Sequence, residues 1–317
     1  HPSMQDITLA NFEADLITGS MQQPVLLDIW APWCGPCKVL GPVLEKLEVA
    51  YAGRFKLAKL NSDEQQDIAG QLSQAFGVRS IPFCVMFAGG QPVDGFVGAL
   101  PEAQIKAFLD KHVPIADEME AEAETEEPEA LIAEGDPDAA LAKLQQAVAI
   151  DPANDDARYD YVKLLLARGD LAMAEQAFEP VVKKVALDVR LDALAHWIAA
   201  HKSVAGARDA TTLAAAIAAN KRDFDARFEL AQGHFAAQRW TEALDELLEV
   251  IMRDKAWNND LARKTYVAIL ALMAKPAPKS ATAGPSKGAL EVTGKAAAAV
   301  SADLVVHRNI KKKKKAQ

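Results

Sequence analysis

The chain has 317 residues, half of them apolar and a quarter charged, with a formal net charge of −9. This length exceeds that of one typical domain and predicts two or three, and the composition is ordinary for a globular protein. No stretch approaches the ~18–20 apolar residues needed to span a bilayer. Three cysteines are too few for the disulfide framework of a small secreted domain.

The N-terminus lacks a basic region followed by an apolar run, so we expect no signal peptide and a cytoplasmic protein. Residues 1–3 are interpreted as a non-native remnant, with Met4 as the natural start. A periplasmic protein whose signal has already been removed is the alternative.

Residues 4–114 alternate strand and helix patterns, which predicts an α/β domain. In chain order, the patterns predict a helix over 11–19, a buried strand over 24–30, a helix over 36–50 kinked at Pro42, a strand over 55–60, a helix over 68–76, strands over 83–87 and 93–97 joined as a hairpin, and a closing helix over 102–112.

The rest of the chain divides into an acidic linker (115–128), a helical region (129–274) and a basic tail (275–317). The helical region carries a 34-residue period, in which Ala140 corresponds to Ala174 and, about two repeats later, to Ala243. This period predicts tetratricopeptide-like helical hairpins, with a small residue where two helices approach closely. A plain helical bundle with accidental spacing is the alternative.

The tail is rich in Pro, Gly, Ala, Ser and Lys and ends in five lysines at 311–315, so we expect it to be disordered. Binding to an acidic surface or to RNA by charge alone is the alternative. No nucleic-acid fold signature accompanies the tail, and we therefore do not expect a nucleic-acid partner.

The motif Trp33-Cys34-Gly35-Pro36-Cys37 directly follows the predicted strand and opens a helix. At a helix start, unpaired backbone N–H groups and the positive end of the helix dipole stabilise a thiolate and lower its pKa. Pro36 favours the helical φ at the first turn. We therefore expect Cys34 to attack and Cys37, one turn further on, to resolve the mixed disulfide.

A structural zinc site is the competing interpretation of the cysteine pair, but it requires two further ligands at close spacing. Cys84 stands alone in an apolar run and is interpreted as a buried small hydrophobe, with a regulatory thiol as the alternative. We expect no metal and no cofactor beyond a redox-active Cys34–Cys37 disulfide.

The segment from Leu26 to Lys38, LLDIWAPWCGPCK, resembles the active-site segment of thioredoxins, and the similarity extends over residues 6–112. The resemblance implies further roles. It makes Asp28 a buried proton acceptor with a pKa raised by burial, Lys59 its neighbour, and Pro82 a cis-proline facing the dithiol. It places a substrate groove along Trp33, Gly35, Pro36, Ile81, Val97 and Gly98. Phe83 departs from the small polar residue usual there and is expected to alter the groove.

A thioredoxin-like domain followed by an acidic linker and tetratricopeptide-like repeats resembles the chaperedoxin family (YbbN/CnoX). The resemblance implies a stress-response co-chaperone that binds unfolded or oxidised proteins, protects or reduces their cysteines and passes them to the DnaK system and the GroEL chaperonin. Thiol–disulfide oxidoreductase activity would then accompany chaperone function. A dedicated protein disulfide reductase served by thioredoxin reductase or glutathione, and a non-enzymatic repeat scaffold, are the alternatives.

Overall fold

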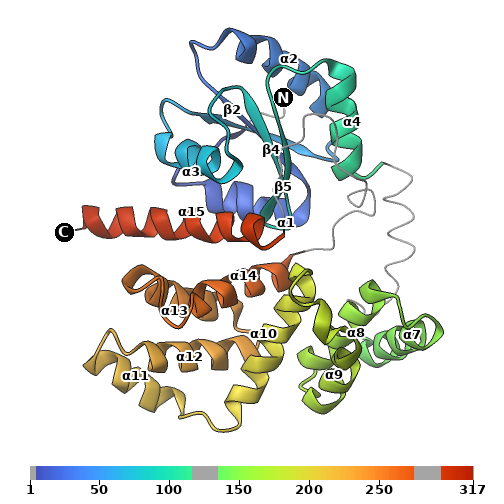
Figure 1. Cartoon of the computed structure of the whole chain (residues 1–317), viewed down its shortest axis with the longest axis vertical. Coiled ribbons are helices and arrows are strands. Elements are labelled where there is room, and N and C mark those ends of the chain that lie inside the picture. Colours follow the sequence, from blue (N-terminus) through green and yellow to red (C-terminus); the bar gives the residue numbers. More distant parts are fainter. Residues whose placement is uncertain (1–4, 116–134, 275–293, 317) are drawn as a thin grey trace. The chain divides into compact units, whose positions relative to one another are not determined.

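The computed structural model describes residues 5–115, 135–274 and 294–316. The chain divides into two compact units (Figure 1): the first comprises His1–Met119 and Met273–Gln317, and the second Glu120–Leu272. Nearly all of the linker predicted over 115–128 lies outside the described residues.

A five-stranded sheet in the order β1-β3-β2-β4-β5 organises the first unit. Its strands are β1 (Gln5–Asp6), β2 (Val25–Trp30), β3 (Lys56–Asn61), β4 (Phe83–Ala88) and β5 (Gln91–Val97). The first three are mutually parallel, whereas β4 runs antiparallel to β2 and β5 antiparallel to β4. The central strand β2 is almost entirely buried, because it has a neighbour on each side and a layer on each face.

Helical segments connect these strands and cover the sheet (Figure 1). They are the π-helical segment η1 (Glu13–Thr18) and the helices α1 (Gly19–Gln22), α2 (Gly35–Ala50), α3 (Gln66–Phe76) and α4 (Glu102–His112). α2 runs without interruption through Pro42. Leu40 and Leu44 of α2 and Phe108 of α4 join Leu26 of β2 and Phe96 of β5 in one buried cluster, which fixes α2 against the sheet.

The second unit is helical in its described part. Its elements are α7 (Pro137–Ile150), α8 (Asp155–Ala167), α9 (Leu171–Phe178), the 3-10 segment η2 (Glu179–Lys184), α10 (Val189–Val204), α11 (Ala210–Ala219), α12 (Phe224–Ala236), α13 (Trp240–Arg253) and α14 (Leu261–Met273). The alanines Ala140, Ala174 and Ala243 are fully buried, as the spacing predicted.

The turns before these alanines are also equivalent. Gly135, Gly169 and Gln238 occupy corresponding positions, five residues before the buried alanine in each repeat, and all three have positive φ (83°, 79° and 62°). A left-handed residue ends one helix and allows the chain to turn into the next. Together with the predicted α/β domain, this confirms the expected fold class.

The prediction of disorder after residue 274 is wrong for residues 294–316, because α15 (Gly294–Lys315) is a helix. α15 lies beside β5 and α3 of the first unit (Figure 1), with Ala302, Leu304 and Val305 buried. The average composition of the tail concealed this short apolar segment. Residues 275–293 lie outside the described part.

Polar contacts also tie α15 to the first unit. The Ser301 hydroxyl donates to the Gly90 carbonyl oxygen at 2.5 Å, Arg308 pairs with Glu13, and Lys311 pairs with Asp67. None of the helices described combines the length and the apolar character that crossing a lipid bilayer requires.

Candidate functional site

Cys34 caps the N-terminus of α2. Its backbone is extended (φ −86°, ψ 110°), and its Sγ accepts a hydrogen bond from the Cys37 N–H at 3.2 Å. Gly35 and Pro36 form the exposed first turn. The Cys34 sulfur thus lies at a helix start, where backbone N–H groups have no intrahelical partners. This position favours negative charge on Cys34 in the reduced protein.

Cys34 and Cys37 form a disulfide, with Cα atoms 5.3 Å apart, so the structure represents the oxidised protein. The two cysteines are 3% and 5% exposed and cluster with Ala31, Trp30 and Ile81. Burial leaves little of the sulfur surface open, so a substrate disulfide must lie close to the surrounding loops to reach it.

Asp28 is 1% exposed and lies in β2, below the loop that carries the dithiol. In the sheet register it is opposite Lys59 of β3 on one side and Cys84 of β4 on the other. Burial raises the pKa of Asp28 from 3.8 to about 6, and the nearby Lys59 ammonium and a hydrogen bond from Cys84 oppose that shift. Asp28 can therefore exchange a proton close to neutral pH.

Lys59 is directed toward the underside of α2. Its Nζ lies 5.1 Å from the centroid of the Trp30 ring. A Cβ atom added at Gly41 of α2 would lie 3.7 Å from the same Lys59 nitrogen. The glycine in α2 thus leaves room for a cation between helix and sheet, where it acts electrostatically on Asp28.

The loop before β4 brings Pro82 and Ile81 to the dithiol. The Ile81–Pro82 peptide bond is cis, as the resemblance implied, and the Ile81 carbonyl oxygen lies 3.9 Å from Cys34 Sγ. Gly98, which follows Val97 at the end of β5 and has φ +88°, donates its N–H to the Pro82 carbonyl oxygen at 2.8 Å. This bond ties the two loops together beside the disulfide.

Trp33 forms an exposed wall next to the cysteines. Its side chain is 69% exposed, and its indole Nε1 donates to Asp63 Oδ1 at 3.2 Å. Asp63, in the loop after β3, thus holds the ring in one orientation. The sequence did not indicate this contact, because the partners are 30 residues apart and share no local pattern.

Phe83 and Cys84 lie in the interior. Phe83 is 1% exposed, so its bulk enters the core and offers no surface to a groove, contrary to the expectation from sequence. Cys84 is fully buried, as expected, and burial raises the pKa of its thiol. Its Sγ lies 3.9 Å from Asp28 Oδ1, a contact that the sequence did not predict.

Five large aromatic residues of the helical unit divide into two groups by their exposure. Tyr159, Tyr161 and Trp197 are buried, whereas Trp240 and Phe228 are only partly covered.

Within the described residues, no group of three or more His, Cys, Asp or Glu side chains is arranged to hold a metal ion. The redox group of the protein is the Cys34–Cys37 disulfide.

A disulfide at a helix start, a cis-proline beside it and a buried carboxylate beneath it define a thioredoxin-type thiol–disulfide protein. The thioredoxin family model matches residues 3–111, and tetratricopeptide repeat models match residues 131–198 and 203–283.

Individual thioredoxins are similar over the same part of the chain. Thioredoxin 1 of Nostoc is 40% identical over 107 residues, which cover 34% of this chain and 94% of that protein. Thioredoxin of Haemophilus influenzae is 44% identical over 104 residues, or 33% of this chain and 92% of that protein. The chain belongs to the thioredoxin family and carries tetratricopeptide repeats after its thioredoxin domain, which indicates thioredoxin-like redox activity together with protein–protein interaction.

Proposed function

We propose that this protein is a cytoplasmic redox-active co-chaperone that binds unfolded or oxidised proteins and protects or reduces their cysteines. The observation that carries the proposal is the Cys34 Sγ at the start of α2, in a chain that also contains a repeat unit built to bind proteins.

In the proposed reduction, the Cys34 thiolate attacks one sulfur of a client disulfide. A Cys34–client disulfide forms, and the other client sulfur leaves as a thiolate. Cys37 then transfers its proton to the Asp28 carboxylate and attacks Cys34 Sγ. The Cys34–Cys37 disulfide forms, the second client sulfur leaves and takes up a proton, and two electrons have passed from the dithiol to the client.

The surrounding residues have supporting roles in this proposal. Lys59 limits how far burial raises the Asp28 pKa, and Pro82 with Ile81 orients the client backbone beside Cys34. The remaining groove residues, which contact the client without taking part in the chemistry, are Trp33, Gly35, Pro36, Val97 and Gly98. Thioredoxin reductase or glutathione would return the protein to its dithiol form.

The chaperone half of the proposal rests on the repeats, because stacked helical hairpins present an extended surface to other proteins. Release of clients to the DnaK system and GroEL, during a response to oxidative stress, completes the proposal. It is supported by the resemblance to chaperedoxins and by the presence of both an intact dithiol and a repeat unit in one chain.

Mixed-disulfide trapping tests the redox half. Cys37→Ser removes the resolving thiol, so clients should remain bound to Cys34 and elute from the purified protein only with reductant. The double variant Cys34→Ser/Cys37→Ser is the control and should retain none of them. If Cys37→Ser also retains no client after oxidative treatment of a lysate, the proposed reaction at Cys34 is wrong.

Suppression of aggregation tests the chaperone half. The protein should keep a chemically unfolded substrate in solution even when both cysteines are replaced, because binding through the repeats needs no disulfide. A dedicated reductase would instead reduce insulin disulfides without suppressing aggregation, and that result would exclude the co-chaperone. DnaK and GroEL should be recovered without reductant if they bind non-covalently.

A further inference from the structure

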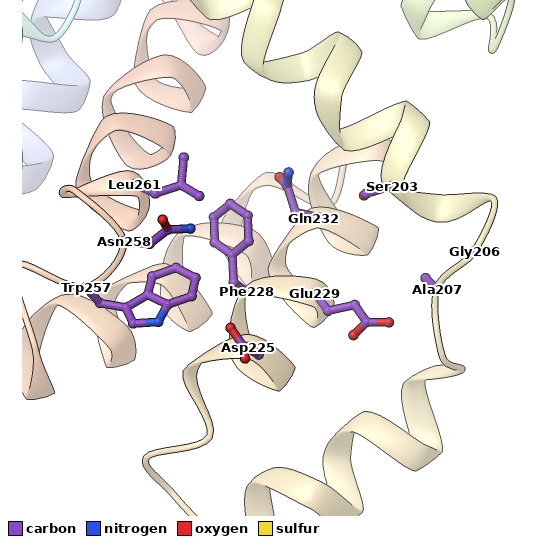
Figure 2. Close-up of a pocket in the computed structure, with 10 residues that line it drawn as sticks. All are labelled: Ser203, Gly206, Ala207, Asp225, Phe228, Glu229, Gln232, Trp257, Asn258 and Leu261. Carbon is purple, nitrogen blue, oxygen red and sulfur yellow. The ribbon is translucent and has the colours of Figure 1, made fainter.

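The helical unit contains an open hollow of about 340 Å³ beside α12 and the loop that leads into α14 (Figure 2). Two aromatic rings form one wall, Phe228 of α12 and Trp257 of the loop, with centroids 5.3 Å apart. Both rings are only partly buried, and the close-up shows them side by side at the hollow. Aromatic faces carry partial negative charge and attract cations.

The two charged side chains that line the hollow are both carboxylates. Asp225 is exposed at the rim, and Glu229 is one turn further along α12. Glu229 already accepts hydrogen bonds from the backbone and side chain of Arg208, each at 2.7 Å. Among the described residues that line the hollow, none carries a positive charge. Because Arg208 is paired with Glu229, the exposed carboxylate of Asp225 is the further negative charge that the lining offers to a ligand.

Gln232 supplies a second, independent indication of a ligand. It lines the hollow and is 7% exposed, yet its side-chain Oε1 has no hydrogen-bond partner. A buried carbonyl oxygen without a donor costs stability, and such groups are uncommon in folded proteins. A donor on a bound group would satisfy it.

We propose that this hollow binds the arginine side chain of an extended segment of a partner protein. The planar guanidinium would stack on Trp257 and Phe228, pair with Asp225 and donate to Gln232 Oε1. A guanidinium can make these contacts together because it is flat and carries several N–H donors. This proposal extends the proposed client binding. It rests on that proposed function only for the identity of the protein that supplies the segment. It does not involve the dithiol.

A pair of matched peptides tests the proposal with the full chain. One is a fluorescein-labelled Gly-Ser-Ala-Arg-Ala-Ser-Gly amide, and the other has citrulline, which has the same shape without the charge, in place of arginine. Fluorescence anisotropy gives both dissociation constants. We expect the arginine peptide to bind about tenfold more tightly, in line with a partly desolvated cation–π contact.

Variants assign that preference to the hollow. Trp257→Leu should remove most of it, and Asp225→Asn, a change at an exposed position, should reduce it about two- to fivefold. Glu242→Gln, an exposed carboxylate of α13 outside the hollow, is the control and should change nothing. Far-UV circular dichroism checks that each variant is folded. If Trp257→Leu does not fold, Asp225→Asn still tests the proposal.

Equal affinity for the two peptides, or a preference that survives both Trp257→Leu and Asp225→Asn, would overturn the proposal. The Cys34→Ser/Cys37→Ser protein should bind both peptides as the native sequence does, so failure of the redox reaction and failure of this site are distinguishable.

Discussion

Replacing the buried Asp28 by asparagine should stabilise the thioredoxin domain in a strictly pH-dependent way. The folded-state pKa of about 6 lies above the ordinary value of 3.8, so ionising Asp28 costs stability. The penalty is absent well below pH 3.8, grows as the pH rises from 3.8 to 6, and is fully present above that. A difference of roughly two pH units corresponds to about 3 kcal/mol.

Asp28→Asn keeps the shape of the side chain and removes its charge. The free energy of unfolding of the oxidised variant should exceed that of the native sequence by about 3 kcal/mol at pH 8 and by only about 0.5 kcal/mol at pH 4. The exposed carboxylate of Glu45 provides the control. Glu45→Gln should change stability by less than about 0.5 kcal/mol at both pH values.

Urea unfolding followed by pulsed hydrogen exchange and mass spectrometry is the suitable assay, because peptides from β2 and β3 report on the thioredoxin domain separately from the repeats. A stability difference between Asp28→Asn and the native sequence that stays constant from pH 4 to pH 8 would refute the assignment of a raised pKa to Asp28. The reasoning would fail equally if the variant were less stable at pH 8.

Three further perturbations test other parts of the structure. Cys84→Val removes the thiol that donates to Asp28, so the Asp28 pKa should rise above about 6; a carboxyl-carbon NMR titration that shows no rise would contradict the hydrogen bond. Ala174→Leu overfills a fully buried position and should cost the repeat unit about 1–3 kcal/mol in urea unfolding, whereas Ala214→Leu on the exposed side of α11 should cost less than about 0.5 kcal/mol. Lys311→Glu sets like charges against each other at Asp67 and should speed hydrogen exchange across α15; Lys314→Glu, at an exposed position, is its control, and equal exchange in the two would show that the ion pair does not hold the helix.

The position of the dithiol could be predicted because its determinants are local. Cys34, Pro36 and Cys37 lie within four consecutive residues, and an apolar strand followed by a helix pattern already places them at a helix start. The buried alanines of the repeats could also be predicted, since a fixed period in sequence becomes a fixed position in a stacked fold.

Contacts across the sheet could not be predicted in the same way. Cys84 meets Asp28 because β4 pairs with β2 in one particular antiparallel register, and a single sequence does not specify register between strands 56 residues apart. Phe83 was misjudged for a different reason: it lies on the opposite side of the sheet from Cys84, and both sides of β4 are buried.

Because α15 belongs to the first unit, that unit is discontinuous in the chain, and this affects its biosynthesis. A ribosome completes the sheet and its four connecting helices long before it makes Ser301, Leu304 and Val305. Until then, the surface of β5 and α3 that α15 covers must remain exposed while the entire helical unit is translated. Nascent chains that stop before α15 should therefore present an uncovered apolar patch, a target for the cell's quality-control proteases.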